Sequence, residues 1–361
     1  MTSRERVRRA LRKQAVDRVP IFMWFHPRTT ARLAELLEIG PGDVAEAMGN
    51  DIRQTWVNNN YAMEGIVHER DGEGHTDLWS IRWVKQFDFN QIERFPLAGL
   101  SRERVLAYRF PDEHREFLLS LMQPVVDSRG DAYIGCDISP CIFEMYWRLR
   151  GMEDAMLDMA ADPALATEMF RRCADFSIAL GEAACRRFPL DWYWTGDDVA
   201  GQRSMMMSPN AWRELVKPHL ARVFAVGKAH QLPVAYHCCG ALRPIIPDLI
   251  EIGLDILNPI QANCPGMEAL ELKHEYGSRI AFMGGVDTQA LLPFGSVDDV
   301  RRATVRLIEG MTADGGGFIL AASHTIPPNA PDENIFAMYE EAGVTRQEIF
   351  DRAAEIRARK D

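Results

Sequence analysis

In the stretch VAYHCCGALRPIIPDLIEIGLDILNP, residues 234–259, a helix-like segment separates two short apolar runs. The runs Val234–His237 and Asp255–Pro259 are bounded by turn residues, as buried parallel strands are. Between them, residues 244–251 have the apolar spacing of an amphipathic helix, and Gly253 follows as a helix stop. A strand, a helix and a second strand in this order predict a parallel β–α–β unit.

The same alternation continues over most of the chain in both directions. Further β-like runs occupy residues 19–24, 132–137, 191–195, 280–284 and 317–321. Helix-like segments lie between them, two of which begin with a capping serine, at Ser208 and Ser296. Seven candidate strands and one that the pattern does not reveal would close an α/β fold of the distorted (β/α)8 TIM-barrel type, with its cleft at the C-terminal ends of the strands. The alternative is a doubly wound open sheet, but no G-x-G-x-x-G turn follows the first run.

The composition is that of an ordinary globular protein, since 47% of the 361 residues are hydrophobic and 26% are charged. We find no linker, so residues 1–361 are expected to form a single domain. The net charge of −11 gives no general attraction for nucleic acid or anionic lipid. No apolar run approaches the roughly 20 residues that span a bilayer. We expect a cytoplasmic monomer or homodimer that binds a small molecule.

Two further observations concern the N-terminal residues and the cysteines. Residues 1–12 predict an amphipathic helix with arginines on one side. The seven cysteines are an odd number and do not indicate a disulfide framework in a chain of this length.

Nearly every candidate strand ends in a residue that can titrate, donate a hydrogen bond or bind a metal ion. In a parallel barrel these strand ends surround one cleft, so the coincidence predicts a functional site there. The residues concerned are His26 with Arg28, Asp137, Asp197 with Asp198, His237 with Cys239, Asn258 with Gln261, Asp287, and His324; Gln202 lies just beyond the third strand.

The most informative of these strand ends is His237-Cys238-Cys239. In an extended chain, residues i and i+2 share a face, so His237 and Cys239 point together and Cys238 points the opposite way. An imidazole and a thiolate suit Zn²⁺, and a catalytic zinc takes about three protein ligands. His324 is the natural third ligand if the barrel closes. The alternative is a pair of buried thiols beside a hydrogen-bonded histidine.

The acidic and basic residues at the other strand ends have two interpretations each. Asp197 and Asp198 are adjacent, so one carboxylate can face the cleft while the other caps the next helix. An inward carboxylate would act as a general acid, a substrate contact or a fourth metal ligand. Asp287 has the same two interpretations. His26 and Arg28 would bind an anionic substrate, and the alternative for a lone arginine such as Arg28 is a surface ion pair.

Motifs spread over almost the full length resemble the uroporphyrinogen decarboxylase superfamily. They are Asp17–Pro20, Leu149–Glu153, Gly196–Asp198, Ser208–Pro209, Lys217–Pro218, His237–Gly240, Asp255–Asn258, Gly284–Asp287, His324–Pro328 and Pro331–Asn334. The resemblance implies a distorted (β/α)8 barrel. One branch of the superfamily decarboxylates tetrapyrrole side chains without a cofactor. The other transfers methyl groups to or from cobalamin and binds zinc through His-x-Cys and a later Cys.

The resemblance favours the methyltransferase branch. His237 and Cys239 match its zinc pair, and His324 stands at the position of the later Cys, where decarboxylases also carry a His. Arg28 is alone in the stretch that is Arg-rich in decarboxylases, and amides at 58–60 stand near the Asp that holds the pyrrole NH groups. One arginine cannot pair with several carboxylates, and neutral amides cannot stabilise a protonated pyrrole as a carboxylate would.

The sequence therefore predicts a zinc-dependent methyltransferase or demethylase that moves a methyl group between a small substrate and a corrinoid or thiol acceptor. The corrinoid, methylcobalamin or a relative, would be carried by a separate protein. His237, Cys239 and His324 would hold zinc, Asp198 and His324 would be catalytic, and the substrate would contact His26, Arg28, Asp197, Gln202 and Asp287. The alternatives are a uroporphyrinogen decarboxylase-type decarboxylase and a non-catalytic ligand-binding barrel.

Overall fold

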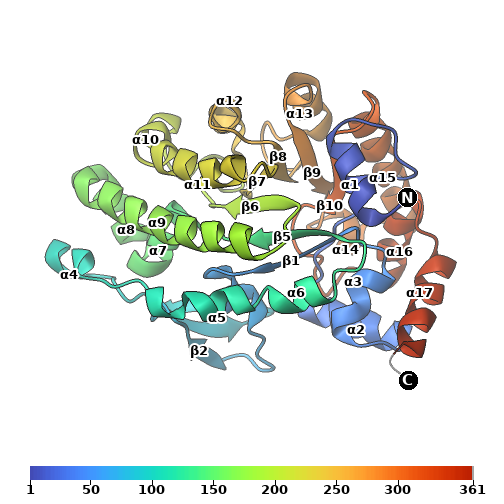
Figure 1. The fold of residues 1–361 in the computed structure, drawn as a ribbon, viewed down its shortest axis with the longest axis horizontal. Helices are drawn as coiled ribbons and strands as arrows, with labels where there is room; N and C mark the ends of the chain where they lie inside the picture. Colours follow the sequence, from blue (N-terminus) through green and yellow to red (C-terminus); the bar gives the residue numbers. More distant parts are fainter. Residues whose placement is uncertain (360–361) are drawn as a thin grey trace.

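The computed structural model describes residues 1–359 and is built around a curved parallel sheet with helices on its outer side (Figure 1). The strands run in the order β1-β5-β6-β7-β8-β9-β10, and every neighbouring pair is parallel. Their bounds are Ile52–Trp56 (β1), Tyr133–Asp137 (β5), Trp192–Gly196 (β6), Val234–His237 (β7), Ile256–Ile260 (β8), Ala281–Val286 (β9) and Phe318–Ala322 (β10). Six of these strands lie within one or two residues of the runs predicted from the sequence.

The eighth position of the barrel, between β10 and β1, is occupied by residues 20–26. Ile21 pairs with Leu320 of β10 through an isolated bridge, and the carbonyl of Ile21 accepts a hydrogen bond from the N–H of Asp51. The predicted strand at 19–24 therefore occupies a strand position of the barrel but forms no regular ladder of hydrogen bonds with its neighbours. The reason is that both backbone groups of Met23 bond to the side-chain amide of Asn50 rather than to a strand.

The strand that the sequence pattern did not reveal is β1. Its sequence, Ile-Arg-Gln-Thr-Trp, is polar in the middle, and only Ile52 is fully buried. A half-buried strand of this kind lacks the apolar run by which the other strands were recognised. With β1 and residues 20–26 in place, the sheet closes as a distorted (β/α)8 barrel.

Two hydrophobic cores lie on the two sides of the sheet. The larger core packs the helices against the outer face, and the smaller one fills the barrel interior. Trp192 and Trp194 of β6 point inward, whereas Tyr193 between them points to the helices, as the strand period of two requires. Helix α1 (Ser3–Leu11) closes the N-terminal end of the barrel with Val7 and Leu11.

The remaining helices follow the strands around the outside (Figure 1). They are α2 (Pro27–Leu37), α3 (Val44–Ala47), α4 (Arg102–Leu106), α5 (Arg115–Ser120), α6 (Gln123–Asp127), α7 (Phe143–Arg150), α8 (Met152–Ala161), α9 (Pro163–Arg187), α10 (Pro209–Leu215), α11 (Lys217–Ala229), α12 (Ile246–Glu251), α13 (Ala269–Tyr276), α14 (Leu291–Phe294), α15 (Val297–Thr312), α16 (Asp332–Glu341) and α17 (Arg346–Ala358). Ser208 caps α10 and Ser296 forms a capping box at α15, as their sequences predict. No helix in residues 1–359 is long and apolar enough to cross a membrane.

A small antiparallel sheet is inserted between β1 and β5. It consists of β2 (Gly74–Thr76), β3 (Arg82–Gln86) and β4 (Phe89–Arg94), in that order. The π-helical turn η2 (Tyr61–Gly65) leads into it, and η2 contacts both β1 and β4. The sequence pattern did not predict this insertion, which supplies one wall of the site described below.

Candidate metal centre

Three predicted ligands meet at the C-terminal end of the barrel. His237 ends β7, Cys239 follows two residues later, and His324 follows β10; one ligand atom of each lies within 4.8 Å of the others. The Sγ of Cys239 lies 3.5 Å from the Nε2 of His237. Tetrahedral zinc with ordinary Zn–N and Zn–S bonds separates an N and an S ligand by about 3.5 Å. The donor atoms and their spacing therefore fit a zinc ion.

The ring of His237 is fixed by a neighbouring strand. Its Nδ1 lies 2.7 Å from the Oδ1 of Asn258, a buried residue of β8. An amide oxygen only accepts, so Nδ1 carries the hydrogen and Nε2 keeps its lone pair for a metal. Desolvation lowers the pKa of His237, and it also lowers the pKa of His324, the more exposed of the two rings. Both rings are thus held in the neutral form that binds metals.

The thiol of Cys239 lies in surroundings that disfavour its ionised form. Burial raises the pKa of this thiol well above its ordinary value, and the charge of Asp198 raises it further. The protein alone therefore disfavours the thiolate, and a bound divalent cation would reverse this effect. Cys238 points away into the outer hydrophobic core, as the alternation of an extended chain predicts. All seven cysteines are free thiols.

Asp198 lies beside the ligands and holds the loop that carries one of them. Its Oδ1 accepts a hydrogen bond of 2.8 Å from the backbone N–H of Cys239, and its own N–H donates to Glu144 Oε2 at 3.0 Å. Burial, followed by the charge of Glu144, raises the pKa of Asp198 to about 7. The carboxyl group is consequently able to gain or lose a proton near neutral pH.

Asp197 faces in another direction and caps a helix. Its two carboxylate oxygens accept the backbone N–H groups of Ile142, Phe143 and Glu144 at the start of α7, at 2.8–3.1 Å. The side chain is fully buried, and burial raises its pKa to about 7. Of the two interpretations of Asp197, the structure supports helix capping and leaves no free carboxylate oxygen for a substrate.

Two other predicted substrate residues are also held by the protein. Asp287 accepts backbone N–H groups from residues 289–291, so its carboxylate shapes the turn before α14. The Oε1 of Gln202 accepts from Nε2 of Gln261 at 3.1 Å, and neither side chain lines the cavity next to the metal ligands. The side chains of Asp287 and Gln202 therefore bond within loops and do not line the cavity wall.

A cavity of about 400 Å³ extends from His324 to the inserted sheet. Its size lies in the range of small-molecule sites. His26 and Arg28 do reach its wall, where the guanidinium of Arg28 pairs with Asp88 at 2.6 Å and Nε2 of His26 meets the carbonyl of Asp88 at 2.8 Å. The remaining wall is largely apolar and aromatic, with Met63, Ile66, Trp83, Phe89, Phe95 and Trp147.

Sequence reasoning missed several residues of the site. Glu64 of η2 lines the cavity, and its charge acts to raise the pKa of both His237 and His324. Glu144 connects Asp198 with the buried Arg148, to which it is bonded at 2.5 Å. The i, i+4 spacing of Glu144 and Arg148 on one helix was the available signal. Nothing in the sequence pattern indicated Glu64.

The asparagines at 58–60 have structural bonds. The amide of Asn58 donates to the carbonyls of Ile138 and Pro140, and Asn59 bonds to Asp77 and accepts from Arg148. Asn58 and Asn59 are fully buried. The chain therefore presents no carboxylate from 58–60 toward the cleft.

The curved parallel barrel, with a site at the C-terminal ends of its strands, can be compared with known protein families. A model of the uroporphyrinogen decarboxylase (URO-D) family matches residues 132–343, more than half of the chain, so the protein belongs to the URO-D family. The search of curated proteins found no match.

Comparison with solved structures extends this likeness to the whole fold. A methyltransferase from Methanosarcina mazei is similar with a TM-score of 0.66 and 18% identity, over 95% of this chain and 98% of that one. At this identity the likeness concerns the fold. α-L-Fucosidase isoenzyme 2 from Paenibacillus thiaminolyticus gives a TM-score of 0.41 at 13% identity, covering 95% of this chain and 50% of that one, and supports no argument.

Proposed function

We propose that this protein is a zinc-dependent methyltransferase or demethylase that moves a methyl group between a small substrate and a corrinoid or thiol acceptor. The observation that carries the proposal is the convergence of His237, Cys239 and His324 within 4.8 Å, with His324 lining the cavity. Three protein ligands leave the fourth position of a tetrahedral zinc open, as catalytic zinc sites require. The corrinoid would be bound to a separate protein.

Zinc, when bound, would supply a Lewis acid that lowers the pKa of a coordinated thiol. The protein's own residues would orient the metal ligands and position the substrate. Asn258 holds the ring of His237, and Asp198 holds the backbone of Cys239, so both ligands are oriented in advance. The aromatic cavity wall would position the substrate and exclude water.

The transfer is balanced as follows for a thiol acceptor. A thiol acceptor would form an S–CH₃ bond and lose its proton, and the bond between the methyl carbon and the cobalt of the corrinoid substrate would break with its electron pair left on cobalt. Asp198, whose pKa burial raises to about 7, would accept that proton. The reverse balance describes demethylation of a small substrate with the corrinoid as acceptor.

Decarboxylation of a tetrapyrrole is the weaker candidate. A substrate with several carboxylates needs several free cations, and the one predicted arginine, Arg28, is already paired with Asp88. Anaerobic incubation with uroporphyrinogen should therefore give little or no coproporphyrinogen. Rapid formation of that product would assign the protein to the decarboxylase branch.

The test of the proposed function is metal content together with methyl transfer. Protein purified without chelator should contain about one zinc per chain and should demethylate methylcobalamin in the presence of a small thiol, followed by the change in cobalamin absorbance. Cys239→Ser should lose most of the metal and the activity, whereas Cys185→Ser, remote from the site, should keep both. Metal-free wild-type protein that remains folded and active would contradict the proposal. A folded protein that binds a small molecule but has neither metal nor transferase activity would favour the non-catalytic ligand-binding barrel.

A further inference from the structure

The cavity beside the metal centre contains one carboxylate that no donor of residues 1–359 engages. Two of the lining residues are acidic, Glu64 and Asp88, and Asp88 is paired with Arg28 at 2.6 Å. Glu64 lies in the π-helical turn η2, is half-buried, and makes no hydrogen bond or ion pair within the described residues. Both oxygens of Glu64 are therefore free to accept hydrogen bonds inside the cavity.

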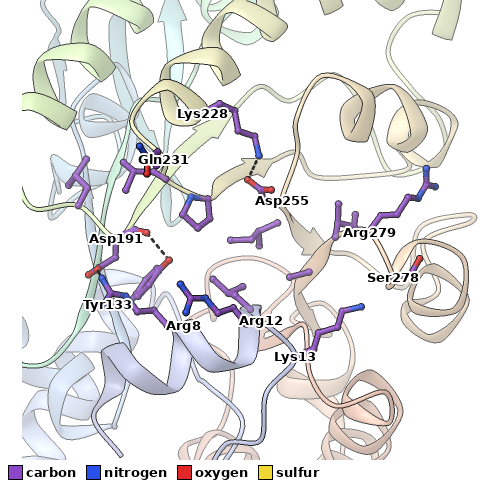
Figure 2. A pocket seen from close by; sticks show the side chains of 17 residues that line it. Arg8, Arg12, Lys13, Tyr133, Asp191, Lys228, Gln231, Asp255, Ser278 and Arg279 are labelled. Atoms are coloured by element: carbon purple, nitrogen blue, oxygen red, sulfur yellow. Dashed lines mark hydrogen bonds and ion pairs between the residues drawn. The ribbon is translucent and has the colours of Figure 1, made fainter.

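Other carboxylates at the two ends of the barrel are engaged by donors of the protein. In the cavity at the opposite end of the barrel, Asp255 bonds to Lys228 and Asp191 bonds to two arginines of α1 (Figure 2). Near the metal centre, both oxygens of Glu144 accept hydrogen bonds. Burying a charge without a partner costs free energy, so a half-buried carboxylate without a donor, as at Glu64, indicates a partner that is acquired in the working state of the site.

Among the three metal ligands, His324 is the one that lacks an orienting partner. The ring of His237 is held by Asn258, and the backbone of Cys239 is held by Asp198. The ring of His324 makes no hydrogen bond within residues 1–359. A histidine that binds a metal through one nitrogen almost always donates the hydrogen of its other nitrogen to a carboxylate, a carbonyl or a water. The same cavity is thus lined by a ring that needs an acceptor and by a carboxylate that has no donor.

The electrostatics of the site associate Glu64 with His324. Desolvation and the charge of His237 lower the pKa of His324, and among the acidic groups that oppose this Glu64 has a larger effect than Asp198 or Glu144. Desolvation also lowers the pKa of His237, but there Glu144 opposes it more than Glu64 does. Charge interactions weaken with distance, so this order agrees with the shared cavity wall of Glu64 and His324.

We propose that Glu64 is the positioning residue of His324, whose ring nitrogen facing away from the metal donates a hydrogen bond to the Glu64 carboxylate. The inference rests on the proposed function, since it concerns the same metal site. Glu64 would orient the ring of His324 as Asn258 orients that of His237, and would make the metal-binding nitrogen more basic. Because η2 contacts both β1 and β4, this one hydrogen bond would couple the inserted sheet to the metal centre.

The test is zinc affinity of the full chain, measured in competition with a chromophoric chelator. Glu64→Ala should weaken zinc binding about 10–100-fold, as loss of such an orienting group does. Glu64→Gln also lacks the charge but keeps an acceptor oxygen, so it should bind zinc about 5-fold or more tightly than Glu64→Ala. In a His324→Cys background the ligand has no second donor, and the two Glu64 variants should agree within about 2-fold. Comparing Gln with Ala in both backgrounds separates the hydrogen bond from a general effect of charge on the cation.

A matched control removes another carboxylate of the same insertion. Glu69→Ala takes away an exposed acid that does not line the cavity and should leave the zinc affinity unchanged. Glu64 has no partner whose loss would unfold the chain, and circular dichroism of each variant checks this. The inference alone is overturned if the wild type binds zinc and Glu64→Ala binds it as tightly, or if Gln and Ala at position 64 do not differ beside His324. A wild type that binds no zinc would overturn the proposed function together with this inference.

Discussion

His237 and His324 are held very differently at the metal centre. The ring of His237 is fixed by Asn258 and packs near Trp24 and Trp194, with ring centres 5.9 and 6.3 Å away. His324 makes no side-chain hydrogen bond within residues 1–359, and its ring centre lies 6.2 Å from that of His237. A residue without such a partner is free to turn toward a metal or toward a substrate, so the role of His324 needs a direct test.

Replacement of His324 should separate a metal ligand from an acid–base group. If it binds zinc, His324→Ala should weaken zinc binding by about 10-fold or more, because even residues behind the ligands contribute about 10–100-fold. His324→Cys should restore the metal, since a thiolate is an equally good ligand. The measurement is zinc stoichiometry after dialysis against a weak chelator. Full zinc retention in His324→Ala would reject the three-ligand site.

A buried acid near the site gives a prediction about pH. Burial raises the pKa of Asp137, at the end of β5, to about 7, against about 4 in an unfolded chain. Between these values the folded state binds more protons, so ionisation of Asp137 lowers the free energy of unfolding as pH rises. Asp137→Asn mimics the neutral acid and still accepts from the N–H of Ser139.

The variant and the wild type should therefore be about equally stable near pH 4. At pH 8 Asp137→Asn should be the more stable protein, by on the order of 2–4 kcal/mol. Urea unfolding at several pH values measures this difference. A difference that is independent of pH would show that Asp137 is ionised throughout this range.

Helix α7 is the element that connects the barrel to the metal centre. Its first N–H groups bond to Asp197, and its Glu144 receives the N–H of Asp198, so adjacent carboxylates have separate tasks. Asp197→Ala should lower the free energy of unfolding by about 2–4 kcal/mol, because buried helix donors lose their acceptors.

The matched variant Asp198→Ala should behave in the opposite way. It removes the acceptor for the N–H of Cys239 and should weaken zinc binding about 10–100-fold with a smaller loss of stability. Urea unfolding and zinc titration of both variants distinguish the two roles. Equal zinc affinity in Asp198→Ala and wild type would remove Asp198 from the metal centre.

At the scale of the whole molecule, the tightly filled barrel interior limits what the strands can carry. A Cβ on Gly135 of β5 would lie 1.8 Å from Nε1 of Trp192, so this position leaves space for the indole. Gly135→Ala should therefore destabilise the protein by at least about 2 kcal/mol through overpacking. Gly42→Ala, with nothing within 4 Å of its Cβ, should change the stability by less than about 0.5 kcal/mol. Thermal unfolding compares them, and equal midpoints would show that the interior can rearrange.

The strands that are buried on both faces, and the shared face of His237 and Cys239, could be predicted from the sequence. Apolar runs of four to six residues form the buried strands of a parallel barrel, because both faces of such strands are covered. Alternation along an extended chain fixes which side chains share a face. The same alternation along β6 places Trp192 and Trp194 in the barrel interior.

Features that depend on contacts between distant segments became visible only in the folded structure. The half-buried strand β1 and the inserted sheet β2–β4 carry no distinctive periodicity, so neither they nor Glu64 in η2 were predicted. The separate tasks of Asp197 and Asp198 follow from where the start of α7 lies, 53 to 55 residues away in the chain. The sequence predicts that residues two apart in an extended chain share a face, but the distant residue that each one contacts is fixed only when the chain folds.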